Sequence, residues 1–262
     1  MLARLGDRSV LQQVGKEALL HHSSYKSWFQ SLRCITEQYG LTDPLLIIQS
    51  PPSKESWNRL CKAKVISWWE QRLRGEATLL SSLSYFKASY MSLNRPHPMW
   101  TMAESPYEVS KACTVATMLS GRYVTDHRAR YWSASNPSGF CQLCLLTGYP
   151  ETPGTLEHQL LKCPAISETR LRSISHWSDY MTDKPELLAI VKHHSLTQGP
   201  EGESLFVQLL LDPTACPVVI KAVQVLGDGV LSHLLYMTRT WCHSLHLKRR
   251  RLFKLYNINR TI

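Results

Sequence analysis

Cys141-Gln-Leu-Cys144 and, thirteen residues later, His158-Gln-Leu-Leu-Lys-Cys163 form the most informative stretch of this 262-residue sequence. The surrounding region, 123–164, has little hydrophobic periodicity and is rich in Asn, Pro, Ser and Gly, so apolar burial does not explain how it stays ordered. Zinc takes four thiolate or imidazole ligands in a tetrahedron, and two short-spaced pairs bridged by a loop supply them. We therefore predict one zinc ion held by Cys141, Cys144, His158 and Cys163.

The spacing within each pair sets conditions on the local structure. Two residues between the first two thiols suit a tight turn in which both sulfurs face one point. His158 and Cys163 are five residues apart, about 500° on a regular α-helix, so they diverge unless the helix loosens. Pro164 ends a helix at this point, and Thr155 is suited to cap a short helix that turns His158 inward. Four protein ligands close the coordination shell, which indicates a structural ion and not a catalytic one.

The alternative for this stretch is a loop that contains four unrelated thiol and imidazole groups. Cys-x-x-Cys alone is a weak signal. Its combination with the second pair in a segment that lacks a core is a strong one, because metal binding then supplies the ordering free energy.

Outward from this stretch the sequence has a helical pattern. Apolar residues recur at helical spacing and are bounded by capping residues, Gly or Pro, in segments at about 24–39, 54–76, 106–121, 186–193, 204–211 and 230–247. The predicted fold class is mainly α, with helical bundle segments around a small zinc-stapled CCHC loop module. We divide the chain into a helical region (1–100), a capped helix with the zinc module (101–180), and a helical region with a basic tail (181–262).

The helix at 54–76 carries an aromatic stripe that includes Trp57, Trp68 and Trp69. Indoles gain much free energy from burial, so we expect the stripe in a core. Three thiols within helical patterns are also predicted in the core: Cys34, Cys61 and Cys113.

The net charge of +10 is concentrated in two places. Six cations and no acid lie between 248 and 262, and a second group of cations, interleaved with aromatic residues, precedes the zinc motif. Phosphates pair with cations, and bases stack on aromatic rings. The pattern therefore favours a nucleic acid as the partner, either single-stranded RNA or DNA or a structured RNA. A solvated basic face or a nuclear localisation signal explains the C-terminal run as well. The candidate contacts are Arg122, Arg128, Arg130, Tyr131, Trp132, Lys248, Arg249, Arg250, Arg251 and Lys254.

Catalytic motifs do not stand out. The sequence contains no Walker A motif, no G-x-S-x-G and no H-E-x-x-H, and its seven Asp residues include no adjacent pair for two-metal chemistry. We therefore expect no enzymatic activity and no catalytic residues. The first residues hold no apolar segment typical of a secretory signal, and 218–237 is interrupted by charge, so we also expect no membrane anchor.

Several motifs resemble the region downstream of the polymerase in LINE-type, non-LTR retrotransposon reverse transcriptases. They are Ser105-Pro-Tyr-Glu-Val109, Met118-Leu-Ser-Gly-Arg-Tyr123, the Arg-x-Arg-Tyr-Trp of 128–132, and the two ligand pairs with their flanks. The resemblance implies that the four ligands form a CCHC zinc knuckle that helps to hold RNA template or target DNA. It also implies an upstream polymerase domain in a full-length element, whose paired aspartates this chain lacks.

The function we predict is a zinc-dependent nucleic-acid-binding module, placed in the nucleus or in a cytoplasmic ribonucleoprotein. The alternative is an interaction adaptor in which zinc orders a loop that binds protein.

Overall fold

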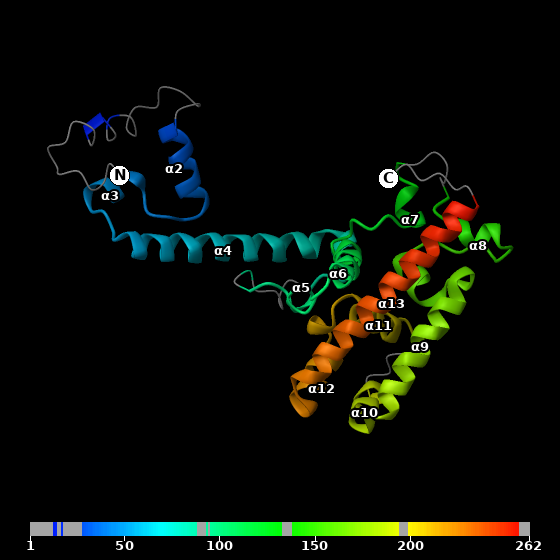
Figure 1. Cartoon of the computed structure of the whole chain (residues 1–262). Helices are drawn as coiled ribbons and strands as arrows, with labels where there is room; N and C mark the ends of the chain where they lie inside the picture. The colour runs from blue at the N-terminus through cyan, green and yellow to red at the C-terminus, as the bar shows by residue number, and fades with distance from the viewer. Residues whose placement is uncertain are drawn as a thin grey trace. The chain divides into compact units, whose positions relative to one another are not determined.

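The computed structural model describes residues 13–14, 17, 28–87, 93, 95–132, 138–193 and 199–256. In this part of the chain all regular structure is helical, and the single β feature is an isolated bridge between Phe140 and Pro153 (Figure 1). The predicted fold class, mainly α around a Cys3His cluster, is confirmed.

The chain divides into two compact units, 1–75 and 76–262. This division differs from the three predicted regions, because the segments 101–180 and 181–262 share one core. The first unit contains α2 (Trp28–Gln38), α3 (Pro44–Gln49) and most of α4 (Lys54–Leu79).

The aromatic stripe of α4 is not in a core, contrary to the prediction. No described residue of α4 is buried, and Trp69 is 40% exposed. Trp68 instead makes edge-on ring contacts with Tyr39 at 5.2 Å and Trp69 at 4.9 Å, and the Arg72 guanidinium lies over both indoles. A unit of this size can bury only a small share of its surface. The aromatic rings therefore pack against one another and against the Arg72 guanidinium.

The second unit contains the site. The helices are α5 (Pro98–Thr101), α6 (Pro106–Leu119), α7 (Asp126–Ala129), α8 (Gln142–Leu146), α9 (Ser167–Thr182), α10 (Pro185–His193), α11 (Gly199–Leu211), α12 (Pro217–Leu226) and α13 (Asp228–Leu255). The shorter turns are η2 (Ser81–Leu83), η4 (His158–Lys162), η5 (Pro164–Ile166) and η6 (Pro213–Ala215).

The long helix α13 organises the core of this unit. It packs against α6, α9, α11 and α12, and its orange-to-red ribbon runs beside α9 in Figure 1. Leu234, Trp241 and Leu245 are buried along it, with Trp241 edge-on to Trp177 and Phe206. Because α13 continues to Leu255, the basic run predicted to form a tail is helical as far as that residue.

The capping prediction for α6 is confirmed, since the Ser105 side chain accepts a hydrogen bond from the Glu108 N–H at 3.2 Å. The prediction of three core thiols is wrong: Cys34 and Cys113 are exposed and Cys61 is half-buried. Cys113 lies on the outer face of α6, whose inner face is formed by residues such as Ala112 and Val115. Among the described residues, no helix combines the length and apolarity that a bilayer crossing requires.

Candidate metal centre and its surroundings

The first two ligands are placed by a loop that closes on itself. The Cys141 N–H donates to the Thr152 carbonyl at 2.8 Å, and the Gly154 N–H donates to the Gly139 carbonyl at 3.0 Å. Cys141 immediately precedes α8, whose first turns carry Cys144 to the same side. Gly154 is required here, because a Cβ at this position would lie 2.4 Å from the Asp126 Cβ.

The second pair is brought together by a π-helical turn. The Cys163 N–H donates to the His158 carbonyl at 2.6 Å. This hydrogen bond joins residues five apart, as in a π-helix, whereas an α-helix joins residues four apart. The Thr155 hydroxyl accepts from the His158 N–H at 3.2 Å, so the predicted cap forms. Pro164 then begins a new short turn. The helix therefore loosens as the ligand spacing requires, and π turns are often found at functional sites.

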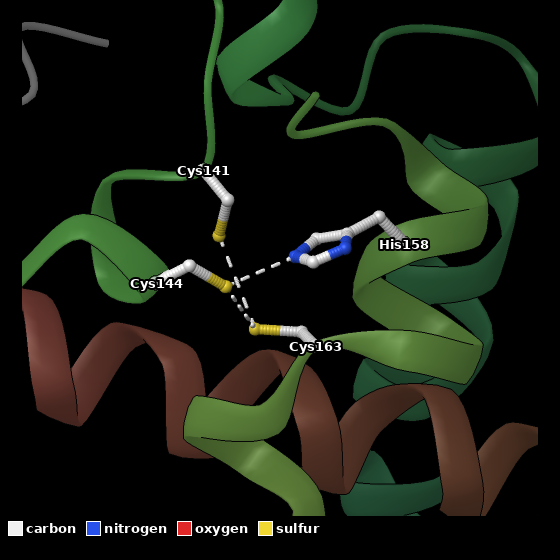
Figure 2. Close-up of side chains that lie close together, drawn as sticks. All are labelled: Cys141, Cys144, His158 and Cys163. Carbon is white, nitrogen blue, oxygen red and sulfur yellow. Dashed lines mark hydrogen bonds between the residues drawn. The ribbon is translucent and has the colours of Figure 1, made fainter. Parts of the chain in front are cut away.

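Figure 2 shows the three sulfurs and the imidazole pointing toward one another. The Cys163 Sγ lies 3.9 Å from the Cys141 Sγ and 3.7 Å from the Cys144 Sγ, and the Cys144 Sγ lies 3.2 Å from the His158 Nε2. All four donor atoms lie within 4.8 Å of one another, and all four residues are buried.

These distances match one tetrahedral ion. Two sulfurs each about 2.3 Å from a metal, at the tetrahedral angle, are about 3.8 Å apart, and a sulfur and an imidazole nitrogen are about 3.5 Å apart. A disulfide would need about 2.05 Å, and all eight cysteines are free. The group is thus compatible with one metal ion such as zinc, and the four predicted ligands are brought together.

The thiols influence one another because they are crowded and buried. A hydrogen bond from Cys163 lowers the pKa of the Cys141 thiol, with further help from His158 and the Cys144 backbone N–H. Burial, followed by the negative charge on Cys141, raises the pKa of Cys144. The pKa of Cys163 is raised by the hydrogen bond between Cys163 and Cys141 and by burial. One thiolate is therefore stable without a cation, and the second and third need one.

Arg170 lies next to the thiols, a position that the sequence pattern does not reveal. It donates a hydrogen bond to the Cys163 carbonyl. Burial lowers the pKa of Arg170, while the sulfurs of Cys163 and Cys144 act in the opposite direction. Three thiolates around a dication leave one negative charge, and the Arg170 guanidinium is placed to offset it.

A buried ion pair connects the centre to α13. The Arg249 guanidinium donates to Asp126 Oδ2 and to Gln159 Oε1, each at 2.5 Å, and the Gln159 amide donates to the Gly154 carbonyl at 3.2 Å. The side chains of Arg249 and Asp126 are 4% and 0% exposed. Arg249 was predicted to contact nucleic acid, and this is corrected: its guanidinium is used inside the protein.

The other predicted contacts fall on two surfaces. Arg122, Arg130, Tyr131 and Trp132 are exposed and Arg128 is half-buried, around the short helix α7. Tyr131 and Trp132 are 70% and 59% exposed. On α13, Lys248 is half-buried, and three cations are exposed: Arg250, Arg251 and Lys254.

A cleft of about 490 Å³ lies beside the segment that leads into His158 of the Cys3His cluster. Tyr131, Trp132 and Arg128 line one part of it, and Tyr85 and Glu157 line another. We call this feature the aromatic cleft. Tyr85 and Glu157 were missed by the sequence analysis, since they are 72 residues apart and no spacing rule joins them.

Glu157 is charged in the aromatic cleft. Burial alone would raise its pKa, but hydrogen bonds from the Tyr85 hydroxyl, from its own backbone N–H and from Thr155 outweigh burial, and the pKa is lowered. Burial raises the pKa of Tyr85, and the hydrogen bond to Glu157 raises it further. The phenol therefore keeps its proton and acts as the donor. The cleft thus combines aromatic faces, a cation and an acceptor.

Comparisons of this chain with protein-family models, with curated proteins and with solved structures gave no match.

We expect one divalent metal ion per purified chain. Substituting Cys141→Ser or His158→Ala removes one of four ligands and should release the ion, whereas Cys113→Ser, on the exposed face of α6, should retain it. Elemental analysis of the three variants and the wild type measures this. Metal-free wild type that remains folded, as judged by circular dichroism, would contradict the expectation.

Metal binding should release protons. At pH 7 the Cys144 and Cys163 thiols are protonated in the metal-free chain, and Cys141 is protonated too where its contact with Cys163 is lost, so Zn²⁺ should displace about two to three protons per ion. Affinity should therefore rise with pH and fall with acid, where protons compete for the same sulfurs. Adding Zn²⁺ to metal-free protein in weakly buffered solution, with a pH indicator, counts them. Release of less than one proton per ion would show that the thiols are already ionised.

Breaking the buried ion pair should destabilise the second unit. Arg249→Met removes the cation that faces the buried Asp126 carboxylate, at a cost of about 3–5 kcal/mol. Arg250→Met, one residue along on the exposed face, should cost less than about 0.5 kcal/mol. Urea unfolding measures both. In the Arg249→Met background, Asp126→Asn should cost less than it does alone, because the two side chains act as one pair; simple additivity would rule the pairing out.

Proposed function

We propose that this chain is a zinc-dependent nucleic-acid-binding module, equivalent to the C-terminal, post-polymerase part of a non-LTR retrotransposon reverse transcriptase. In this role it holds element RNA or target DNA, within a ribonucleoprotein in the cytoplasm or in the nucleus. The observation that carries the proposal is the aromatic cleft: exposed rings and cations gather on segments that the Cys3His cluster orders.

Zinc is the ion we assign to the cluster. Three sulfurs and one imidazole are soft or borderline donors, which disfavours Mg²⁺ and Ca²⁺. The donor spacing suits a tetrahedron, the geometry of structural zinc. Four protein donors fill that shell, so the role we assign to the ion is to order the chain, and the module binds without catalysing.

The ion supports the aromatic cleft through short stretches of chain. Glu157 directly precedes the ligand His158, and Thr155, which caps that ligand, also lines the cleft. On the opposite side of the loop, the His127 N–H donates to the Gly154 carbonyl at 3.2 Å, which attaches α7 to the same segment. Loss of the ion would release both walls together.

The cleft suits an unpaired base. Tyr131 and Trp132 offer exposed ring faces for stacking, which is tolerant of base identity. Arg130 stacks on Tyr131 with its guanidinium 4.7 Å from the ring centre, and so holds both a cation and a ring at the rim. A base in a duplex cannot reach such a cleft, so the partner is single-stranded or a loop of structured RNA.

A protein-interaction adaptor is the second candidate, and one observation favours it. The rings of α4 are not buried in the described structure, with Trp69 40% and Leu60 37% exposed. Such apolar area can serve a protein partner. An adaptor of this kind would keep its function when the cations near the metal centre are removed, whereas nucleic-acid retention would be lost.

The stacking residues should account for much of the affinity for single strands. Tyr131→Ala and Trp132→Ala should each weaken binding of a labelled single-stranded RNA by about 1–3 kcal/mol, roughly 5- to 150-fold, because each removes a stacking face. Tyr149→Ala is the matched control: this ring is 45% exposed on the metal loop but does not line the cleft. Fluorescence anisotropy gives the affinities, with DNA of the same sequence in parallel. Equal affinities for all three variants would overturn the assignment.

A further inference from the structure

A second hollow lies between α9 and α13, away from the residues of the aromatic cleft. It is a groove of about 460 Å³, and we call it the α9–α13 groove. It is lined by Glu168, Thr169, Arg172, Ser173, His176, Thr240, Ser244, Leu247, Lys248 and Arg251. None of these residues is among the lining of the aromatic cleft.

The groove follows the packing of two antiparallel helices. Trp177 of α9 contacts Trp241 of α13, and three residues later Tyr180 stacks on His233, so the chains run in opposite directions. Glu168, Arg172 and His176 are each four residues apart and therefore share one face of α9. Eight residues of helix span about 12 Å, which makes the groove long enough for more than one phosphate of a strand.

The cationic side chains near the C-terminal end of α13 point in three directions. Arg249 turns inward to Asp126. Lys248 and Arg251, three residues apart, face α9 and line the groove. Arg250 and Lys254, four residues apart, are exposed and are not part of the lining.

The lining is suited to the sugar–phosphate backbone and not to bases. The lining contains three permanent cations, a single carboxylate and the hydroxyl groups of two Ser and two Thr residues. No Trp, Tyr or Phe is among the described residues that line the groove, and the imidazole of His176 is the one ring in that lining. Glu168, Arg172 and Arg251 are exposed and Lys248 is half-buried, which makes one small anion a weak ligand and favours a polymer whose phosphates add up through counterion release.

Glu168 modulates this charge. It pairs with Arg172 at 2.5 Å, with the two side chains 67% and 76% exposed. An exposed pair of this kind contributes about 0–1 kcal/mol, so an incoming phosphate can replace the carboxylate.

We propose that the α9–α13 groove is a backbone-binding subsite that holds the phosphodiester chain of the single-stranded nucleic acid that the protein binds. This inference rests on the proposed nucleic-acid-binding function and extends it by naming the contacts: Arg172, Lys248 and Arg251, with Glu168 as the opposing charge. The subsite recognises phosphate and sugar and is independent of sequence.

Two variants of equal charge change test the subsite in the full chain. Lys248→Gln with Arg251→Gln removes two groove cations; Arg250→Gln with Lys254→Gln removes two cations from the same helix outside the groove. The probes are a labelled single-stranded RNA and an abasic oligodeoxynucleotide, which offers phosphodiesters without bases. For the groove variant, the slope of log K against log salt should become shallower by about 1.4, at about 0.7 per lost contact to a single strand, with both probes. The outer variant should keep the wild-type slope.

A gain of affinity provides an independent check that loss of folding cannot imitate. Glu168→Gln removes the opposing carboxylate and frees Arg172, so binding of both probes should strengthen and the slope should steepen by up to about 0.7. Unchanged affinity in this variant counts against the subsite.

The outcomes separate the two proposals. If wild-type protein binds RNA and the groove and outer variants lose equal affinity, the subsite is overturned and the aromatic cleft still stands. The same holds if wild-type protein binds RNA but does not bind the abasic probe. Wild-type protein that binds neither probe overturns the nucleic-acid function itself and the subsite with it.

Discussion

Three thiols and an imidazole gathered in a buried space are stable together when a cation holds them. Cys141, Cys144 and Cys163 are each at most 1% exposed, and only the first thiol has a lowered pKa. A second thiolate beside the first, out of water, is strongly unfavourable. A divalent ion reverses the balance, and its binding free energy then becomes folding free energy for the loop and the π turn that carry the ligands.

The ordered loop acts on the rest of the second unit through the Arg249–Asp126 pair. Asp126 begins α7, and its Cβ occupies the space that only a glycine at 154 leaves free. Arg249 then joins this junction to α13, which is the helix that packs against α6, α9, α11 and α12. Charge is thus divided between structure and surface: Arg249 is buried against Asp126, whereas Arg250 and Arg251 on the same helix are exposed.

Much of the metal centre could be predicted from the sequence because ligand chemistry depends on residue type and short spacing. The Thr155 cap and the loosened helix between His158 and Cys163 followed from the same local geometry, and both are present. The fate of the aromatic stripe on α4 could not be predicted in this way. Helical periodicity indicates that residues share a face, but whether that face meets a partner is a tertiary property, and the Trp69 side chain remains 40% exposed.

The basic run shows the same division. By itself, the sequence determined that Lys248 to Arg251 are four consecutive cations, and that four soft donors lie at metal-binding spacing. Only the tertiary structure decided that Arg249 is buried, that Lys248 and Arg251 face α9, and that Tyr85 meets Glu157 across 72 residues. The reason is physical: spacing along a chain fixes local geometry over a few turns, whereas the direction of each helical face depends on the elements packed against it.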